Sequence, residues 1–274
     1  MDSSAQVIIA NLTSPPVLAF AIGLLAVLVK GDLRLPDPIY QGLSIYLLLG
    51  IGIKGGVALR ESDLSDVAIP ALATIILGLL IPVMAFLFSG KITKLSEIDR
   101  GALAAHYGST SLVTFTAALV FLEQSSIQYE GFVTTLLALL EIPGIIVGLM
   151  LGSRHLKRDV SWGESLQEIF SSRSILLLVG GLVLGFATGV VGYAKIEPFF
   201  GALFIGMLTL FLLEMGTLAG RRMRDVKSAG AGLIVFAILF PIVSGVLGVV
   251  FGYLSGLSMG GAAILGVLAA SASY

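Results

Sequence analysis

The chain has 274 residues, of which 57% are hydrophobic and 12% are charged, and its mean hydropathy is +1.03. A soluble domain of this length cannot bury so much apolar surface, so the composition excludes that class and indicates an all-α polytopic membrane protein. The formal net charge of −1 gives no electrostatic reason to expect nucleic acid, and the absence of cysteine excludes disulfides and thiolate metal sites.

Apolar segments follow one another along almost the whole chain. A transmembrane helix needs about 20 mostly apolar residues. The nine candidates are residues 15–30, 39–58, 67–88, 101–122, 131–152, 174–194, 199–219, 229–253 and 260–274. The N-terminus lacks the basic region of a cleavable signal, so we expect the first segment to be retained as a span.

The loop charges predict how these spans are oriented. If the N-terminus is outside, the inside loops hold 13 lysines and arginines, and the outside loops hold 3, namely Lys54, Arg60 and Lys195. Cytoplasmic loops of membrane proteins carry such an excess of positive charge. We therefore expect a protein of the cell membrane (inner or plasma membrane), with its N-terminus outside.

An internal repeat divides the chain into two halves. Asp66 and Pro82 match Asp225 and Pro241 at a spacing of 159, Pro38 and Gly56 match Pro198 and Gly216 at 160, and Ser109-Thr-Ser111 matches Ser271-Ala-Ser273 at 162. The first repeat holds five spans, an odd number, so the second must enter the membrane inverted, as in many secondary transporters. We predict residues 1–152 as repeat one, 153–173 as a cytoplasmic loop and 174–274 as repeat two. The second repeat stops in its fourth helix, so we expect a truncated form that transports poorly.

The fourth segment is predicted to be a broken helix. Gly108, Ser109, Thr110, Ser111 and Thr114 place five small or hydroxylated residues within seven positions. Glycine lowers helix stability, and serine and threonine compete for backbone hydrogen bonds. We expect a second half-helix to begin near Ser111. The alternative is one continuous helix whose hydroxyls bond to their own carbonyl groups.

The second copy of this pattern predicts a shared binding site. Two broken helices from inverted repeats would cross near the middle of the membrane, where their positive N-terminal ends and hydroxyl groups suit a small anion. The candidate anion-binding residues are Gly108, Ser109, Thr110, Ser111, Ser271, Ala272 and Ser273. We expect bulk at Gly108 to block binding and to leave stability nearly intact. The alternative is that these small residues only allow close helix packing.

Three isolated ionisable residues lie in or near apolar segments. A carboxylate in the middle of a span, such as Glu141, costs about 2.5–3.5 kcal/mol on insertion scales, so it should face a partner or a cavity. We predict that Glu141 is a cation ligand; the alternative is a structural carboxyl group. We expect Glu214 to pair with Arg221 or Arg222, and His106 to be a packed neutral histidine. The sequence contains no hydrolase triad, phosphate loop or metal cluster, so we do not expect an enzyme.

Three motifs resemble those of the sodium-dependent bicarbonate transporters known best from cyanobacteria. They are Lys54-Gly-Gly-Val-Ala-Leu-Arg60, Gly108-Ser-Thr-Ser-Leu-Val-Thr114 and Leu122-Glu-Gln-Ser-Ser-Ile-Gln-Tyr-Glu130. The resemblance covers nearly the whole chain. It implies ten spans in two inverted repeats of five, with a core domain that moves against a scaffold domain. It also implies sodium ligands at Ser111, Thr114 and Ser273, beside Glu141, and a PII-like regulatory protein as a partner on the cytoplasmic face.

These observations together predict a Na⁺-coupled symporter of bicarbonate or a similar small anion that works by alternating access. Sodium is the expected coupling ion, and no organic cofactor is expected. The expected partners are the anion, the lipid bilayer and further copies of the chain in a homo-oligomer. Two alternatives stay open: a proton-coupled transporter in which Glu141 cycles protons, and a membrane protein that binds or regulates without transport.

Overall fold

The computed structural model describes residues 9, 12–31, 33–153, 167, 171–226 and 230–273. The elements in these ranges are all helical, which confirms the all-α prediction. They are α2 (Pro15–Leu28), α3 (Asp37–Arg60), α4 (Leu64–Ile92), α5 (Glu97–Gly108), α6 (Leu112–Gln124), α7 (Val133–Ser153), α9 (Arg173–Glu197), the π-helical turn η1 (Pro198–Ala202), α10 (Phe204–Val226), α11 (Gly230–Leu254) and α12 (Met259–Ala270). The predicted cytoplasmic loop, 153–173, lies almost entirely outside the described residues.

The helices agree with the predicted segments but differ from them in length. Six described helices are long and apolar enough to cross a membrane, namely α3, α4, α7, α9, α10 together with η1, and α11. The apolar helices α2 and α12 have only 14 and 12 residues, and the fourth predicted segment is divided between α5 and α6. The prediction of nine spans therefore stays a prediction.

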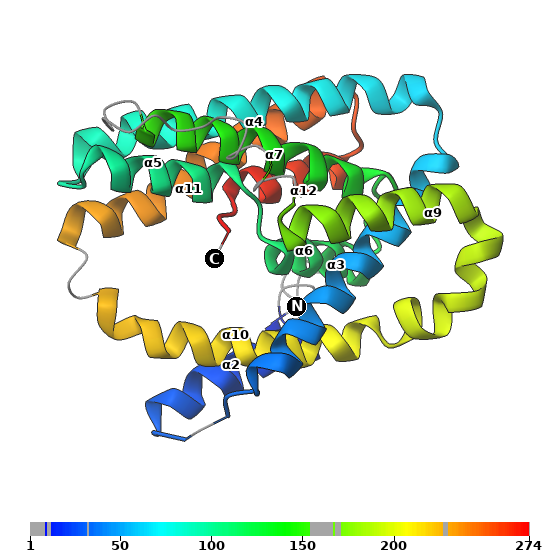
Figure 1. The fold of residues 1–274 in the computed structure, drawn as a ribbon, viewed down its shortest axis with the longest axis horizontal. Coiled ribbons are helices and arrows are strands. Elements are labelled where there is room, and N and C mark those ends of the chain that lie inside the picture. Colours follow the sequence, from blue (N-terminus) through cyan, green and yellow to red (C-terminus); the bar gives the residue numbers. More distant parts are fainter. Residues whose placement is uncertain are drawn as a thin grey trace.

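The helices form two groups. Helices α2 and α10 pack against each other, as do α3 and α9, and α3 also contacts α10. Helices α4, α5, α7, α11 and α12 form the second group, which lies in the upper half of Figure 1 above α2 and α10. Contacts between α3 and α7 join the groups, and α6 contacts α12.

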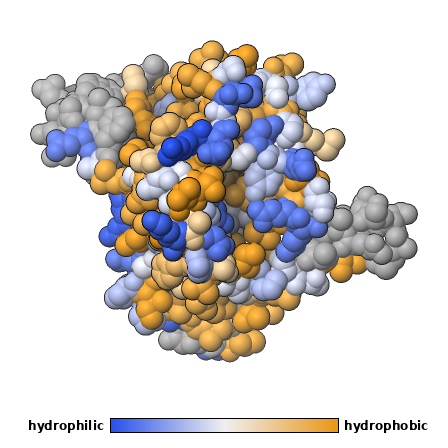
Figure 2. All heavy atoms as spheres, turned by 90° about the vertical axis from the view of Figure 1, so that its right-hand side faces the viewer, coloured by the Kyte–Doolittle hydropathy of each residue, from blue (hydrophilic) through white to orange (hydrophobic). Residues whose placement is uncertain are grey.

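Large apolar side chains cover much of the outer surface. In Figure 2, hydrophobic residues cover the upper and lower parts of the visible face, and hydrophilic residues gather between them. On α9, Val183 and Val191 are 64% and 77% exposed, and on α11 both Ile242 and Val246 are 59% exposed. Apolar surface of this extent is not left in water by soluble proteins. The outer faces of these helices therefore suit a lipid environment.

A backbone-to-backbone helix crossing occurs at a matching glycine in each half of the chain. A Cβ atom at Gly216 in α10 would lie 2.0 Å from the Phe20 carbonyl oxygen in α2. A Cβ atom at Gly56 in α3 would lie 2.0 Å from the Leu182 carbonyl oxygen in α9. Glycine is needed at both positions because any side chain would overlap a backbone atom.

The partner helices contribute a second matching glycine to each crossing. A Cβ atom at Gly23 in α2 would lie 2.1 Å from the Leu213 carbonyl oxygen, and one at Gly185 in α9 would lie 2.0 Å from that of Ile53. In each pair the contacts advance along both helices in the same direction, so α2 runs parallel to α10, and α3 to α9. The two halves thus share this packing, while the inverted orientation of the repeats stays a prediction.

Substitution of Gly216 tests the crossing. We expect Gly216→Ala to lower the free energy of unfolding by about 1–3 kcal/mol, the usual cost of overpacking, because the new methyl group would overlap the Phe20 carbonyl group. Gly206→Ala in the same helix is the matched control, since nothing lies within 4 Å of a Cβ atom there. It should be neutral or slightly stabilising, because alanine is the better helix former. Equal melting temperatures for the two variants would contradict the crossing.

Candidate functional site

The helix break predicted at Gly108–Ser111 is present. Helix α5 ends at Gly108, and α6 begins at Leu112. Ser109 and Ser111 have extended backbones, with φ/ψ of −95°/159° and −98°/116°. Ser111 is the N-cap residue of α6, where its hydroxyl accepts a hydrogen bond from the N–H of Thr114 at 3.4 Å. The alternative of a continuous helix is therefore wrong.

The second copy of the pattern also leaves the helical conformation and lies beside the first. Helix α12 ends at Ala270, and Ser271 has φ/ψ of −80°/159°, close to the values of Ser109. The N–H of Ser111 donates to Ser271 Oγ at 3.2 Å. The N–H of Ser273 donates to the His106 carbonyl oxygen in the last turns of α5 at 2.9 Å. The two extended segments therefore lie side by side, while the crossing of two broken helices stays a prediction.

His106 has a contact that the sequence did not predict. Its side chain is exposed rather than packed, and its Nδ1 atom lies 3.0 Å from Ser273 Oγ and 3.1 Å from the Ser273 carbonyl oxygen. A carbonyl oxygen can only accept, so that contact needs a proton on Nδ1. His106 therefore holds the second break through both its backbone and its side chain.

A polar cavity of about 140 Å³ lies where the first break faces α3, α7 and α9. Its lining residues are Tyr40, Ser44, Leu48, Thr110, Leu137, Glu141, Ser174 and Ser273. A cavity needs only about 10–15 Å³ by this measure to hold one water molecule. This central cavity therefore has room for a small anion, a monovalent cation and water.

Two of the polar groups on this cavity have no partner in the described parts of the chain. The Thr110 side chain is buried, and its Oγ1 atom makes no hydrogen bond. The Glu141 carboxylate accepts no hydrogen bond and forms no ion pair with a described residue. A buried hydroxyl without a partner, such as that of Thr110, costs about 1–3 kcal/mol, and the half-buried Glu141 carboxylate is unfavourable in an apolar helix without a compensating charge or donor. Both groups are therefore placed to be satisfied by a ligand in the cavity.

Glu141 reaches the break because α7 touches α5 at a pair of glycines. A Cβ atom at Gly144 would lie 1.8 Å from the Gly108 carbonyl oxygen, and one at Gly108 would lie 2.7 Å from Gly144 Cα. Glu141 lies one helical turn before Gly144, which places its side chain beside the break. The expectation that bulk at Gly108 would spare stability is wrong, because a larger residue would push α5 away from α7.

The structure gathers the predicted site residues but gives only some of them a place on the cavity. Thr110, Glu141 and Ser273 line it. The other predicted residues border the two breaks without lining the central cavity: Gly108, Ser109, Ser111, Thr114, Ser271 and Ala272. The Ser111 N–H, which was expected to face the anion, donates to Ser271 instead.

Sequence reasoning missed Tyr40, Ser44 and Ser174 on the cavity wall. Each is a polar residue near the start of an apolar helix, in no pattern that marks a site. The signal that could have found them is the topology itself, since the N-terminal parts of the parallel helices α3 and α9 lie together.

Comparison with known families identifies the class of this protein. Residues 15–274 match the family model of the Na⁺-dependent bicarbonate transporter superfamily. The chain belongs to this superfamily. No curated protein sequence matches the chain. The match confirms the resemblance seen in the three motifs. Together with the apolar helices, membership in the bicarbonate transporter superfamily identifies the chain as an integral membrane protein of a transporter family.

The unpartnered hydroxyl of Thr110 gives a direct test of the cavity. We expect Thr110→Val, which keeps the shape, to leave the melting temperature of the empty protein unchanged or higher, because it removes an unsatisfied polar atom. The same variant should weaken binding of bicarbonate by about threefold to tenfold, the loss of one hydrogen bond.

Thr135→Val is the matched control, since Thr135 in α7 also has a buried hydroxyl without a partner and does not line the central cavity. Its melting temperature should behave like that of Thr110→Val, and its bicarbonate affinity should be that of the parent. A parent-like affinity in Thr110→Val would remove this hydroxyl from the site.

Proposed function

We propose that this chain carries out Na⁺-coupled symport of bicarbonate or a similar small anion by alternating access. The observation that carries the proposal is the polar cavity at the meeting point of the two helix breaks, with the unpartnered Thr110 hydroxyl and Glu141 carboxylate on its wall. Membership in the bicarbonate transporter superfamily supports the class of substrate.

The residues on the cavity supply complementary chemistry for an anion and a cation. The hydroxyls of Thr110 and Ser273 can donate to a small oxyanion, and the carboxylate of Glu141 suits Na⁺. Sodium beside Glu141 would neutralise a negative charge that otherwise repels the anion in a medium of low dielectric constant. Coupling follows because each ion makes binding of the other more favourable. The predicted sodium roles of Ser111, Thr114 and Ser273 are part of the proposal.

The arrangement of the helices supports alternating access. The central cavity lies between a group that contains α3 and α9 and a group that contains α7 and the first break. Movement of one group against the other would expose the cavity to each side in turn. The matching glycine crossings in the two halves support the inverted repeat on which this mechanism depends. The homo-oligomer and the PII-like partner remain predictions of the resemblance.

Proton coupling is the second candidate, and one observation favours it. The carboxylate of Glu141 lines the cavity without a hydrogen-bond or ion-pair partner among the described residues. A carboxyl group in that position can bind a proton in place of Na⁺. In that case uptake would follow the pH gradient and would be indifferent to sodium.

Uptake into proteoliposomes separates these candidates. We expect uptake of labelled bicarbonate to require a sodium gradient, and Glu141→Gln to raise the sodium concentration for half-maximal uptake by more than about tenfold. Glu61→Gln, which removes an exposed carboxylate at the end of α3, should leave this value unchanged. Uptake driven by pH alone would favour the proton-coupled alternative, and binding without any uptake would favour a non-transporting protein.

The proposed orientation is testable because the chain has no cysteine. We expect Asp63→Cys, between α3 and α4, to react with a membrane-impermeant maleimide added to intact cells. Lys94→Cys, between α4 and α5, should react only after the membrane is permeabilised, because it lies in one of the positively charged loops. The reverse labelling pattern would place the N-terminus inside.

A further inference from the structure

A second polar cavity, of about 460 Å³, lies at the start of α3 and the end of α10. We call it the arginine cavity. Its lining residues are Arg34, Asp37, Tyr40, Glu214, Met215, Leu218, Arg221 and Arg222. Three arginines and two acidic residues line this cavity, so the lining residues carry a net charge of +1. The positive balance distinguishes it from the central cavity, whose charged lining residue is Glu141.

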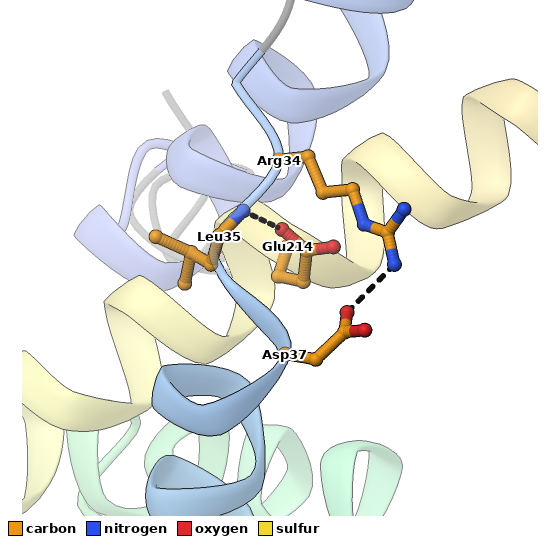
Figure 3. A network of polar contacts seen from close by, with 4 residues as sticks. All are labelled: Arg34, Leu35, Asp37 and Glu214. Atoms are coloured by element: carbon orange, nitrogen blue, oxygen red, sulfur yellow. Dashed lines mark hydrogen bonds and ion pairs between the residues drawn. The ribbon is translucent and has the colours of Figure 1, made fainter.

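Both carboxylates of the arginine cavity are held by groups in the segment just before α3 (Figure 3). The Glu214 carboxylate, on a residue that is only 8% exposed, accepts a hydrogen bond from the Leu35 N–H at 2.7 Å. The Asp37 carboxylate pairs with the Arg34 guanidinium at 2.6 Å. The first contact fastens the segment before α3 to α10, and the second joins that segment to the first residue of α3. Both contacts partly compensate the negative charges. The carboxylates therefore shape the cavity without giving it a negative balance.

The arginines retain the capacity to bind an oxyanion. A guanidinium group has five N–H donors, so one that contacts a carboxylate still has donors for another acceptor. Its planar geometry matches the oxygens of a carboxylate-like anion. Arg221 and Arg222 follow Glu214 by seven and eight positions on α10, which places all three on one face of that helix.

Tyr40 connects this cavity to the central one. Its side chain lines both cavities, and its ring stacks on Phe211 of α10, with centroids 5.4 Å apart and planes 11° from parallel. The two cavities thus adjoin at one aromatic side chain that belongs to a stacked pair. The arginine cavity also lies at the end where the parallel helices α2 and α10 both finish, next to the positively charged loops.

We infer that the arginine cavity is a second anion-binding site, which holds the same small oxyanion between the central cavity and the side of the membrane where the positively charged loops lie. The identity of the anion rests on the proposed function. A positive, partly enclosed cavity raises the local concentration of anions. The anion passes Tyr40 when it moves between the two sites.

Equilibrium binding of labelled bicarbonate to the purified full chain, in a zwitterionic buffer free of other small anions, tests this inference. The parent should bind two ions per chain. Arg221→Gln combined with Arg222→Gln should bind one, because the second site loses its positive balance. The Thr110→Val variant should still bind two ions, but the affinity for one of them should fall by the factor expected for the central cavity.

The matched control is Lys91→Gln combined with Lys94→Gln. It also removes two positive charges next to the same end of the molecule, since Gly232 at the start of α11 packs on the Ile92 carbonyl group at the end of α4, and neither lysine lines the arginine cavity. This control should bind two ions. Melting temperatures close to that of the parent would show that both double variants are folded.

The outcomes separate this inference from the proposed function. An arginine double variant that binds as many ions as the parent overturns the second site. A parent that binds no ion also overturns it, as does a parent that binds one ion whose affinity falls in Thr110→Val and is unchanged in the arginine double variant. If the arginine double variant loses an ion while Thr110→Val binds like the parent, the second site stands and the central site of the proposed function fails. An equal loss in the lysine control would show that only general surface charge matters, which also overturns the inference.

Discussion

The hydrogen bond from the Ser111 N–H to Ser271 Oγ joins two segments that are 160 residues apart in sequence. It forms because both segments leave the helical conformation at a serine, which frees a backbone donor in one and presents a hydroxyl acceptor in the other. Unwound backbone is tolerated at membrane depth only where it is buried in protein or lines a wet cavity. The bond buries the two segments against each other, and the polar cavity lies beside them, so both conditions are met. The rest of the bundle keeps these segments together.

The position of Glu141 follows from this constraint and from the glycine contact of α5 with α7. A carboxylate in an apolar helix is unfavourable unless a compensating charge or donor is near. Gly108 and Gly144 allow the two backbones to touch, and this contact brings the carboxylate to the break rather than to the lipid. In the proposed function, the unfavourable solvation of this carboxylate favours binding of a cation.

The sequence was informative where composition controls local structure. The cluster of glycine, serine and threonine at 108–114 predicted the break, and its second copy predicted which distant segment would lie beside it. Composition was less informative about helix length, because apolar residues continue past the point where a helix ends. Helix α2, for example, stops at Leu28, and Lys30 has a positive φ of 60°.

The role of Gly108 was also hidden, because a glycine that breaks a helix and one that admits a neighbouring helix look the same in sequence. The cavity residues Ser44 and Ser174 depend on tertiary packing, for which a single sequence carries no local signal.

The glycine crossings have a mechanical consequence. Where a Cα atom rests directly on a carbonyl group, as at Gly216 and Gly56, no rotatable side chain lies between the helices to absorb a displacement. Sliding of α2 along α10, or of α3 along α9, would force hard atomic overlaps at every step. By contrast, α3 meets α7 at Gly55 through the side chain of Thr134 rather than through a carbonyl group. The molecule is therefore stiff within each helix pair and more compliant where α3 meets α7, so thermal energy is expected to distort that boundary first.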